Sequence, residues 1–215
     1  MNDYNEDENE REIPEVTAVL QKDLVSDDSL TALAASGDRE AQAEWVSRFM
    51  PRVWRIVYLN CSVPSETEDL VQTAVITALE NLSTYQGPGK FRAWLDRLTI
   101  NVIRTHFRKN RLRRLFFLPL ESAPEPPSRH NTALQVENQQ LMDRLSTHLA
   151  KIPLQNREAL ILSMVMGYGA KEIAEIAGCS VEAAWKRSRR GYQDLMSRVE
   201  RDPDFRASIG ELLHD

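Results

Sequence analysis

The 215-residue chain has only two cysteines, Cys61 and Cys179, and they stand far apart. A disulfide framework needs an even set of cysteines, and a structural zinc site needs cysteines and histidines at short ligand spacings. No such spacing relates the four histidines, which are His106, His130, His148 and His214. We therefore expect no disulfide, no metal and no cofactor.

Signatures of membrane insertion and of catalysis are missing as well. No apolar run approaches the roughly 20 residues of a transmembrane helix, and the N-terminus has no signal peptide. The chain has no glycine-rich phosphate loop, nucleophile elbow or paired-carboxylate site. We expect a cytoplasmic protein that does not enter the membrane and is not an enzyme.

Aromatic residues are scarce, at 7%, and runs of β-branched residues are few. Hydrophobic residues still make up 42% of the chain and charged residues 27%, and long amphipathic segments dominate. This pattern predicts an all-α fold. At this length the chain can form two small helical domains, each with its own core.

The segment 170–190, AKEIAEIAGCSVEAAWKRSRR, has the pattern of a helix-turn-helix. Gly178 suits the left-handed end of a first helix, and Ser180 suits the N-cap of a second. Val181 and Ala184 would pack the second helix on the first. Its exposed residues would reach phosphates or base edges in the major groove of DNA. A helical hairpin with a solvated basic face is the alternative.

A second basic segment, 90–114, carries nine Lys or Arg residues and one acid, Asp96. Its apolar residues follow helical spacing, so we expect one long helix with a basic strip through Asn101, Arg104, Arg108 and Arg111. The preceding loop, 85–89, is rich in turn residues and begins with Tyr85, a candidate for stacking on an unpaired base. Phe91 and Trp94 are more simply explained as core residues.

Two basic segments of this kind resemble the extracytoplasmic-function (ECF) sigma factors, the two-domain specificity subunits of bacterial RNA polymerase. The resemblance runs from about Ser29 to Val199 and is specific through the order and spacing of its motifs. These motifs are AASGDREA (34–41), EDLVQ (68–72), FRAWLDRL (91–98) and IPLQNREALIL (152–162). The chain departs from the pattern at Thr105, where many members have Asp, and at Trp185, where Lys is common.

The resemblance implies partners and roles for individual residues. One set would bind core polymerase, at its clamp helices and its flap: Glu68, Asp69, Leu70, Gln72, Arg157 and Glu158. The loop 85–90 would receive a base flipped from the non-template strand, the following helix would hold the melted strand, and the helix-turn-helix would read a more distant duplex element. The DNA-binding residues so implied are Tyr85, Lys90, Arg92, Asn101, Arg104, Arg108, Trp185, Lys186, Arg187, Arg189 and Arg190.

Charge and composition suggest the organisation of the chain. Residues 1–28 hold ten acids and two bases, a net charge of −8 within a total of −5, so the remainder is net positive. We expect a disordered acidic arm (1–28), a region 2 domain (29–115), a flexible proline-rich linker (116–133), a region 4 helix-turn-helix domain (134–200) and a tail (201–215). The arm would aid solubility or compete with DNA for the basic helices.

Two alternatives to a sigma factor remain open from the sequence. A one-component transcription regulator would bind duplex DNA without polymerase, and an interaction protein would use its basic helices to hold an acidic partner. The family resemblance also implies an anti-sigma factor as a partner.

Overall fold

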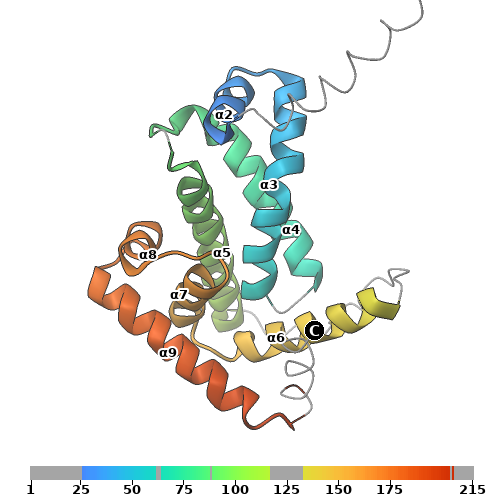
Figure 1. Ribbon diagram of the computed structural model, residues 1–215, viewed down its shortest axis with the longest axis vertical. Helices are drawn as coiled ribbons and strands as arrows, with labels where there is room; N and C mark the ends of the chain where they lie inside the picture. Colours follow the sequence, from blue (N-terminus) through green and yellow to red (C-terminus); the bar gives the residue numbers. More distant parts are fainter. Residues whose placement is uncertain (1–25, 62–63, 88, 117–132, 204, 206–215) are drawn as a thin grey trace, which may run out of the picture.

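The computed structural model describes residues 26–61, 64–87, 89–116, 133–203 and 205, and within them it contains helices and no strand. The all-α prediction is confirmed. Figure 1 shows a first group of helices above and a second group below it. The first group is α2 (Asp27–Ala35), α3 (Arg39–Asn60), α4 (Pro64–Asn81), a 3₁₀ turn (Leu82–Thr84) and α5 (Phe91–Phe116). The second is α6 (Ala133–Ala150), α7 (Leu154–Met164), α8 (Ala170–Ala177) and α9 (Val181–Val199).

Side-chain caps set the start of the first two helices. The Ser26 hydroxyl accepts the N–H of Ser29 at 3.1 Å, and the Asp38 carboxylate accepts the N–H of Ala41 at 2.8 Å. Asp27 and Asp28 are thus first-turn residues of α2, not part of the acidic arm in which the sequence placed them. The rest of the arm (1–25), the linker residues 117–132 and most of the tail lie outside the described residues.

The first group packs around three aromatic rings. Trp45 and Phe49 of α3 and Phe91 of α5 have ring centroids 4.8 to 5.9 Å apart, in tilted or edge-on pairs. All three side chains are buried, which confirms the expectation that Phe91 belongs to the core. Such aromatic pairs favour tilted and edge-on geometry because of the ring quadrupole.

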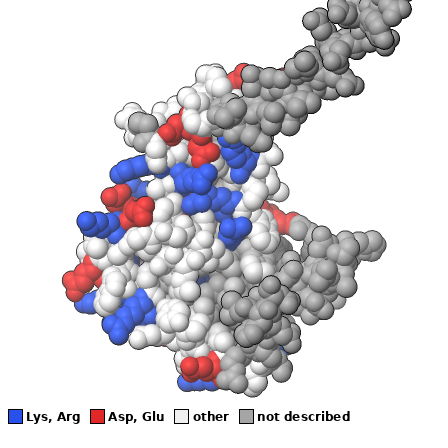
Figure 2. Space-filling model, viewed as in Figure 1, with Lys and Arg blue, Asp and Glu red and all other residues white. Residues whose placement is uncertain are grey.

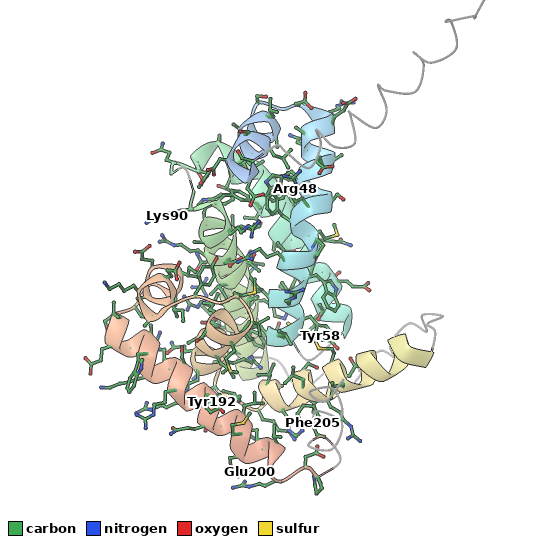
Figure 3. All side chains as sticks on the ribbon, viewed as in Figure 1. Arg48, Tyr58, Lys90, Tyr192, Glu200 and Phe205 are labelled. Atoms are coloured by element: carbon green, nitrogen blue, oxygen red, sulfur yellow. The ribbon has the colours of Figure 1, made fainter. Side chains whose placement is uncertain are left out.

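The two groups share their apolar interior. One cluster runs from Ile103 of α5 to Leu162 of α7 and Ile173 of α8, and a second joins Tyr58 of α3 to Leu149 of α6. In Figure 3, Tyr58 lies at the end of α3 that faces α6. The expectation of a separate core for each domain is therefore wrong. Apolar residues at the far ends of α3 and α5 are covered by the second group, so surfaces between the groups are hidden from solvent.

Candidate nucleic-acid interface

The helix-turn-helix forms as the sequence predicts, with one correction. Gly178 ends α8 in the left-handed conformation (φ 64°), and the Ser180 hydroxyl caps α9 by accepting the N–H of Ala183 at 3.2 Å. Ala184 is buried against α8, whereas Val181 is 47% exposed and does not contribute to the packing stripe. At the start of α8, the Glu172 carboxylate accepts the N–H of the N-cap residue Gly169 at 2.9 Å, and Gly169 has no side chain that could cap the helix.

The outer face of α9 combines one aromatic ring with several cations. Trp185 is 52% exposed, and the Arg189 guanidinium lies 5.3 Å from the centre of its ring, within cation–π range. Lys186 is exposed and pairs with Glu182 at 2.6 Å, and Arg190 is also exposed. Arg187 is half-buried, and its positive charge is one of those that oppose the rise in the pKa of Glu158 of α7. Figure 2 shows blue side chains over α9 at the lower left of the molecule.

A groove of about 660 Å³ lies between α4 and α5. Its apolar lining comes from Leu70, Trp94, Leu98 and Val102. Hydroxyl and amide groups line it as well, and two cations flank it. These polar residues are Thr73, Thr77, Asn81, Thr84, Asn101, Thr105, Arg97, His106 and Lys109. The groove offers both stacking surfaces and phosphate partners to an unpaired strand.

The basic strip on α5 is not exposed along its whole length. Asn101 and Arg108 are exposed, and Asn101 opens into the groove. Arg104, predicted to hold the melted strand, instead turns toward the second group of helices. Its Nε lies 3.0 Å from both carboxylate oxygens of Glu158, its Nη2 lies 2.7 Å from Oε2, and its Nη1 donates to the Ala177 carbonyl at 3.0 Å.

The described residues at the two ends of the loop 85–90, Tyr85 and Gly89, are bonded to α2. The Tyr85 ring meets Phe91 edge-on at 5.3 Å between centroids, and its hydroxyl donates to Asp28 at 2.7 Å. Arg92 pairs with Asp27 at 2.8 Å, and Lys90 lies 3.8 Å from Glu175 of α8. Tyr85 is half-buried, so part of the ring stays accessible to a stacking partner.

The predicted polymerase contacts on α4 divide by helix face. Glu68, Asp69 and Gln72 are exposed, whereas Leu70 is buried in the core, because it lies on the face that packs inside the first group. Ile76, which the sequence reasoning missed, is 54% exposed and follows Asp69 and Gln72 at helical spacing. The sequence did contain a signal for Ile76, because its helical spacing places an apolar residue on the same helix face as these polar residues.

The two predicted flap contacts are not surface residues in this arrangement. Arg157 is 4% exposed and Glu158 is 1% exposed. Arg157 lies 5.5 Å from the Phe107 ring centre and donates to the Leu149 carbonyl at 3.3 Å. Burial raises the pKa of Glu158, against the opposing effect of the hydrogen bonds from Arg104, and burial lowers the pKa of Arg157. Both residues lie where the two groups meet.

A second polar link joins the groups at Asp96, the one acid of the basic segment. Arg52 of α3 donates to both Asp96 oxygens, at 2.7 and 2.6 Å, and Asp96 is fully buried. The same guanidinium donates to the Tyr168 hydroxyl at 2.9 Å, in the segment between α7 and α8. Burial, followed by the charge of Asp96, raises the pKa of Tyr168. The sequence contained no sign of this network because its members are 44 and 116 residues apart.

The fold also brings together Cys61, Glu66 and His106, whose ligand atoms lie within 4.8 Å of one another. Sequence spacing did not predict this cluster. The His106 ring contacts Glu66 at 3.0 Å and Asn110 at 2.9 Å. The positive charge of Arg157 acts on Cys61 and disfavours a cation there. The arrangement is therefore explained as a hydrogen bond between His106 and Glu66 beside a buried thiol.

Comparison with known proteins identifies the family. The Sigma-70 region 2 family matches residues 45–113, and the Sigma-70 region 4 family matches residues 142–195. The chain is 30% identical over 128 residues to the ECF RNA polymerase sigma factor EcfG of Rhodopseudomonas palustris, covering 60% of this chain and 68% of that protein. The chain belongs to the ECF sigma factor family.

Other relatives of this sigma factor support the assignment. It is 29% identical to SigE of Mycolicibacterium smegmatis over 75% of this chain, and it spans 63% of that relative's length. It is 26% identical to CnrH of Cupriavidus metallidurans, covering 83% of this chain and 97% of CnrH. None of the described helices has the length and apolar character to cross a membrane.

Two solved structures have the same fold. CnrH in complex with the cytosolic domain of CnrY has a TM-score of 0.60 at 25% identity, over 82% of this chain and 98% of that one. RpoE in complex with the anti-sigma factor NepR from Bartonella quintana has a TM-score of 0.56 at 22% identity, over 73% and 95% of the two chains. The second likeness concerns the fold alone.

Proposed function

We propose that this sigma factor directs core RNA polymerase to promoters that have two separated elements and that it promotes strand opening near the start site. This proposal rests on the presence, on one chain, of two surfaces that suit DNA binding in different ways. One is the half-apolar groove between α4 and α5, and the other is the outer face of α9. The first suits unpaired bases and the second suits the major groove.

The groove is assigned to the melted strand. Trp94 offers a stacking surface, and the aliphatic side chains that line the groove offer apolar contacts. Asn101 and Thr105 offer hydrogen-bonding groups. Arg97 and Lys109 flank the groove with positive charge that phosphates would neutralise. Tyr85 and the loop after it would hold a flipped base beside this groove. Extruding a base from the duplex costs a few kcal/mol, which contacts in this site must offset.

The exposed residues of α4 are assigned to polymerase. Asp69, Gln72 and Ile76 form a stripe of one carboxylate, one amide and one apolar side chain on a single helix face. Such a mixed stripe suits a partner helix pair better than it suits DNA, because the carboxylate would repel phosphates. We propose that the protein works in the cytoplasm with polymerase and supplies no catalytic group of its own.

The two helix groups must separate for all proposed contacts to form. Arg104 is paired with Glu158, and both Arg157 and Glu158 are covered, so neither the strand nor the flap can reach them in the closed arrangement. We propose that polymerase binding opens the chain and that an anti-sigma factor holds it closed. CnrH has been solved in complex with the cytosolic domain of a second protein, CnrY, which supports a protein partner here.

In vitro transcription tests the proposal. Core polymerase is supplied with a library of genomic fragments, with and without the protein, and new start sites are mapped. We expect discrete starts that share two spaced elements and that Arg189→Glu abolishes. Arg201→Glu, a charge reversal of an exposed residue just beyond α9, is the matched control and should retain them. Duplex binding by the protein alone, with no new starts, would instead support a one-component regulator.

A further inference from the structure

We propose that Asp28 is a positioning residue that holds the loop 85–90 in the shape that receives the flipped base. The inference rests on the proposed function, since it assigns a part in base capture to a residue of α2. Asp28 lies 57 residues before Tyr85, outside every motif that the sequence pointed to. Its part in the site comes from the folding of α2 over the loop.

Asp28 bridges the two ends of the loop. One carboxylate oxygen accepts the Tyr85 hydroxyl at 2.7 Å, and the other accepts the Gly89 N–H at 2.6 Å. Gly89 has φ 82°, a conformation that favours glycine. The Tyr85 hydroxyl also accepts the Lys90 N–H at 3.3 Å and contacts the Gly87 carbonyl. One carboxylate thus fixes both the entrance and the exit of the loop.

The bridge also fixes an aromatic wall. With its hydroxyl tied to Asp28, the Tyr85 ring stays edge-on to Phe91 and 5.8 Å from Trp94, which lines the groove. Burial and the hydrogen bond to Asp28 raise the pKa of Tyr85 to about 12, so the hydroxyl remains a donor at neutral pH. A ring and a loop ordered in advance lose less conformational entropy when a base arrives.

A carboxylate beside a strand-binding surface would ordinarily weaken DNA binding by repelling phosphates. Both Asp28 carboxylate oxygens already accept hydrogen bonds from the loop, so this charge has a structural role. The neighbouring Asp27 provides the comparison, because it is also half-buried in the first turn of α2 but pairs with Arg92 and Arg48 instead of the loop. Asp27→Asn and Asp28→Asn remove the same charge from adjacent positions.

The two variants separate positioning from charge. If only charge mattered, each would strengthen DNA binding by a similar factor. If Asp28 positions the loop, Asp28→Asn places an amide N–H opposite a loop donor and slows promoter opening, whereas Asp27→Asn does not. Tyr85→Phe removes the same hydrogen bond from the other side while keeping the ring, and it should resemble Asp28→Asn.

The experiment uses holoenzyme on a promoter found by start-site mapping, with a fluorescent base analogue at the flipped position. We expect Asp28→Asn and Tyr85→Phe each to slow the opening signal by about tenfold, the rate equivalent of about 1.4 kcal/mol. The double variant should be slowed by less than the product of the two single effects, because both substitutions remove the same Tyr85–Asp28 hydrogen bond. Binding of each variant to core polymerase, and its thermal midpoint, should match the wild type to within a small margin.

The inference would be overturned if holoenzyme with Asp28→Asn opened the promoter at the wild-type rate, or if Asp28→Asn and Asp27→Asn both opened it faster. Either result would leave the proposed function intact. Additive slowing in the double variant would also overturn it, because the two residues would then act separately. Absence of any start site with the wild-type protein would overturn the proposed function and the inference with it. Tyr85→Phe keeps the test decisive should Asp28→Asn impair folding.

Discussion

Arg104 of α5 and Glu158 of α7 form a bidentate ion pair across the two helix groups, with a shortest distance of 2.7 Å. Glu158 is almost fully buried, and Arg104 keeps less than a third of its side chain exposed. The family resemblance gives these residues separate partners, the melted strand and the polymerase flap. In the closed chain, Arg104 and Glu158 are bonded to each other. The ion pair that stabilises closure therefore makes both side chains unavailable to their proposed partners.

Breaking this pair should favour the open chain. Arg104→Ala leaves a buried carboxylate without its main partner, which costs about 3 kcal/mol in comparable pairs. We expect a larger radius of gyration by small-angle X-ray scattering. Arg108→Ala removes an exposed cation one turn along α5 and should leave the radius unchanged. Equal radii for the wild type and Arg104→Ala would show that the pair does not control closure.

The crossing of α9 over α7 should be intolerant of a methyl group at Gly191. A Cβ there would lie 2.6 Å from the Asn156 carbonyl oxygen and 3.0 Å from the Leu160 Cβ, so backbone would have to move. Gly191→Ala should destabilise the protein by about 1–3 kcal/mol, as overpacking does. Gly169→Ala is the control, since its Cβ meets nothing closer than 3.6 Å and its φ is −75°. A thermal melt in which both variants behave alike would contradict the expected close contact.

Arg189 should read a base edge more than a phosphate. Its guanidinium lies 5.3 Å from the centre of the Trp185 ring, and this cation–π contact would restrain the side chain before DNA binds. Arg189→Ala should cost about 1–3 kcal/mol on the preferred upstream element, and much less on a scrambled one. Holoenzyme affinities measured over a range of salt would check this. Equal losses on both sequences, with the salt slope lowered by about one, would assign Arg189 to a phosphate.

Cys61 should be unreactive until the pH is high. Burial, followed by the charge of Glu66, raises the pKa of its thiol to about 12, above the value of about 8.5 of an exposed cysteine. At pH 8, iodoacetamide should therefore modify the half-exposed Cys179 and spare Cys61, as read by peptide mass spectrometry. Modification of both cysteines at similar rates would show that Cys61 is accessible.

The same shift predicts how stability depends on pH. Because the folded pKa of Cys61 exceeds the unfolded one, the stabilisation is complete below the unfolded pKa and is lost as pH rises toward about 12. Thermal midpoints measured from pH 8 to pH 11 should fall, and the fall should be shallower in Cys61→Ala. A slope unaffected by that substitution would assign the loss to other groups.

Local features of the chain follow from its sequence because they depend on neighbouring residues. The turn at Gly178, the cap at Ser180 and the long basic helix α5 all form where the pattern predicts them. Each needs only a short-range contact or a helical period, which a single sequence displays. The order of the motifs was likewise enough to indicate the family.

Long-range contacts could be decided only by the tertiary structure. Arg104, Arg157 and Glu158 look like surface residues in a charged sequence, yet the packing of the two helix groups buries Arg157 and Glu158 and leaves Arg104 half-buried. Asp28 meets the loop 85–90 only because α2 folds over it. Periodicity tells which face of a helix is apolar, but it does not tell which distant polar group satisfies a charge, because that partner is set by how the helices pack.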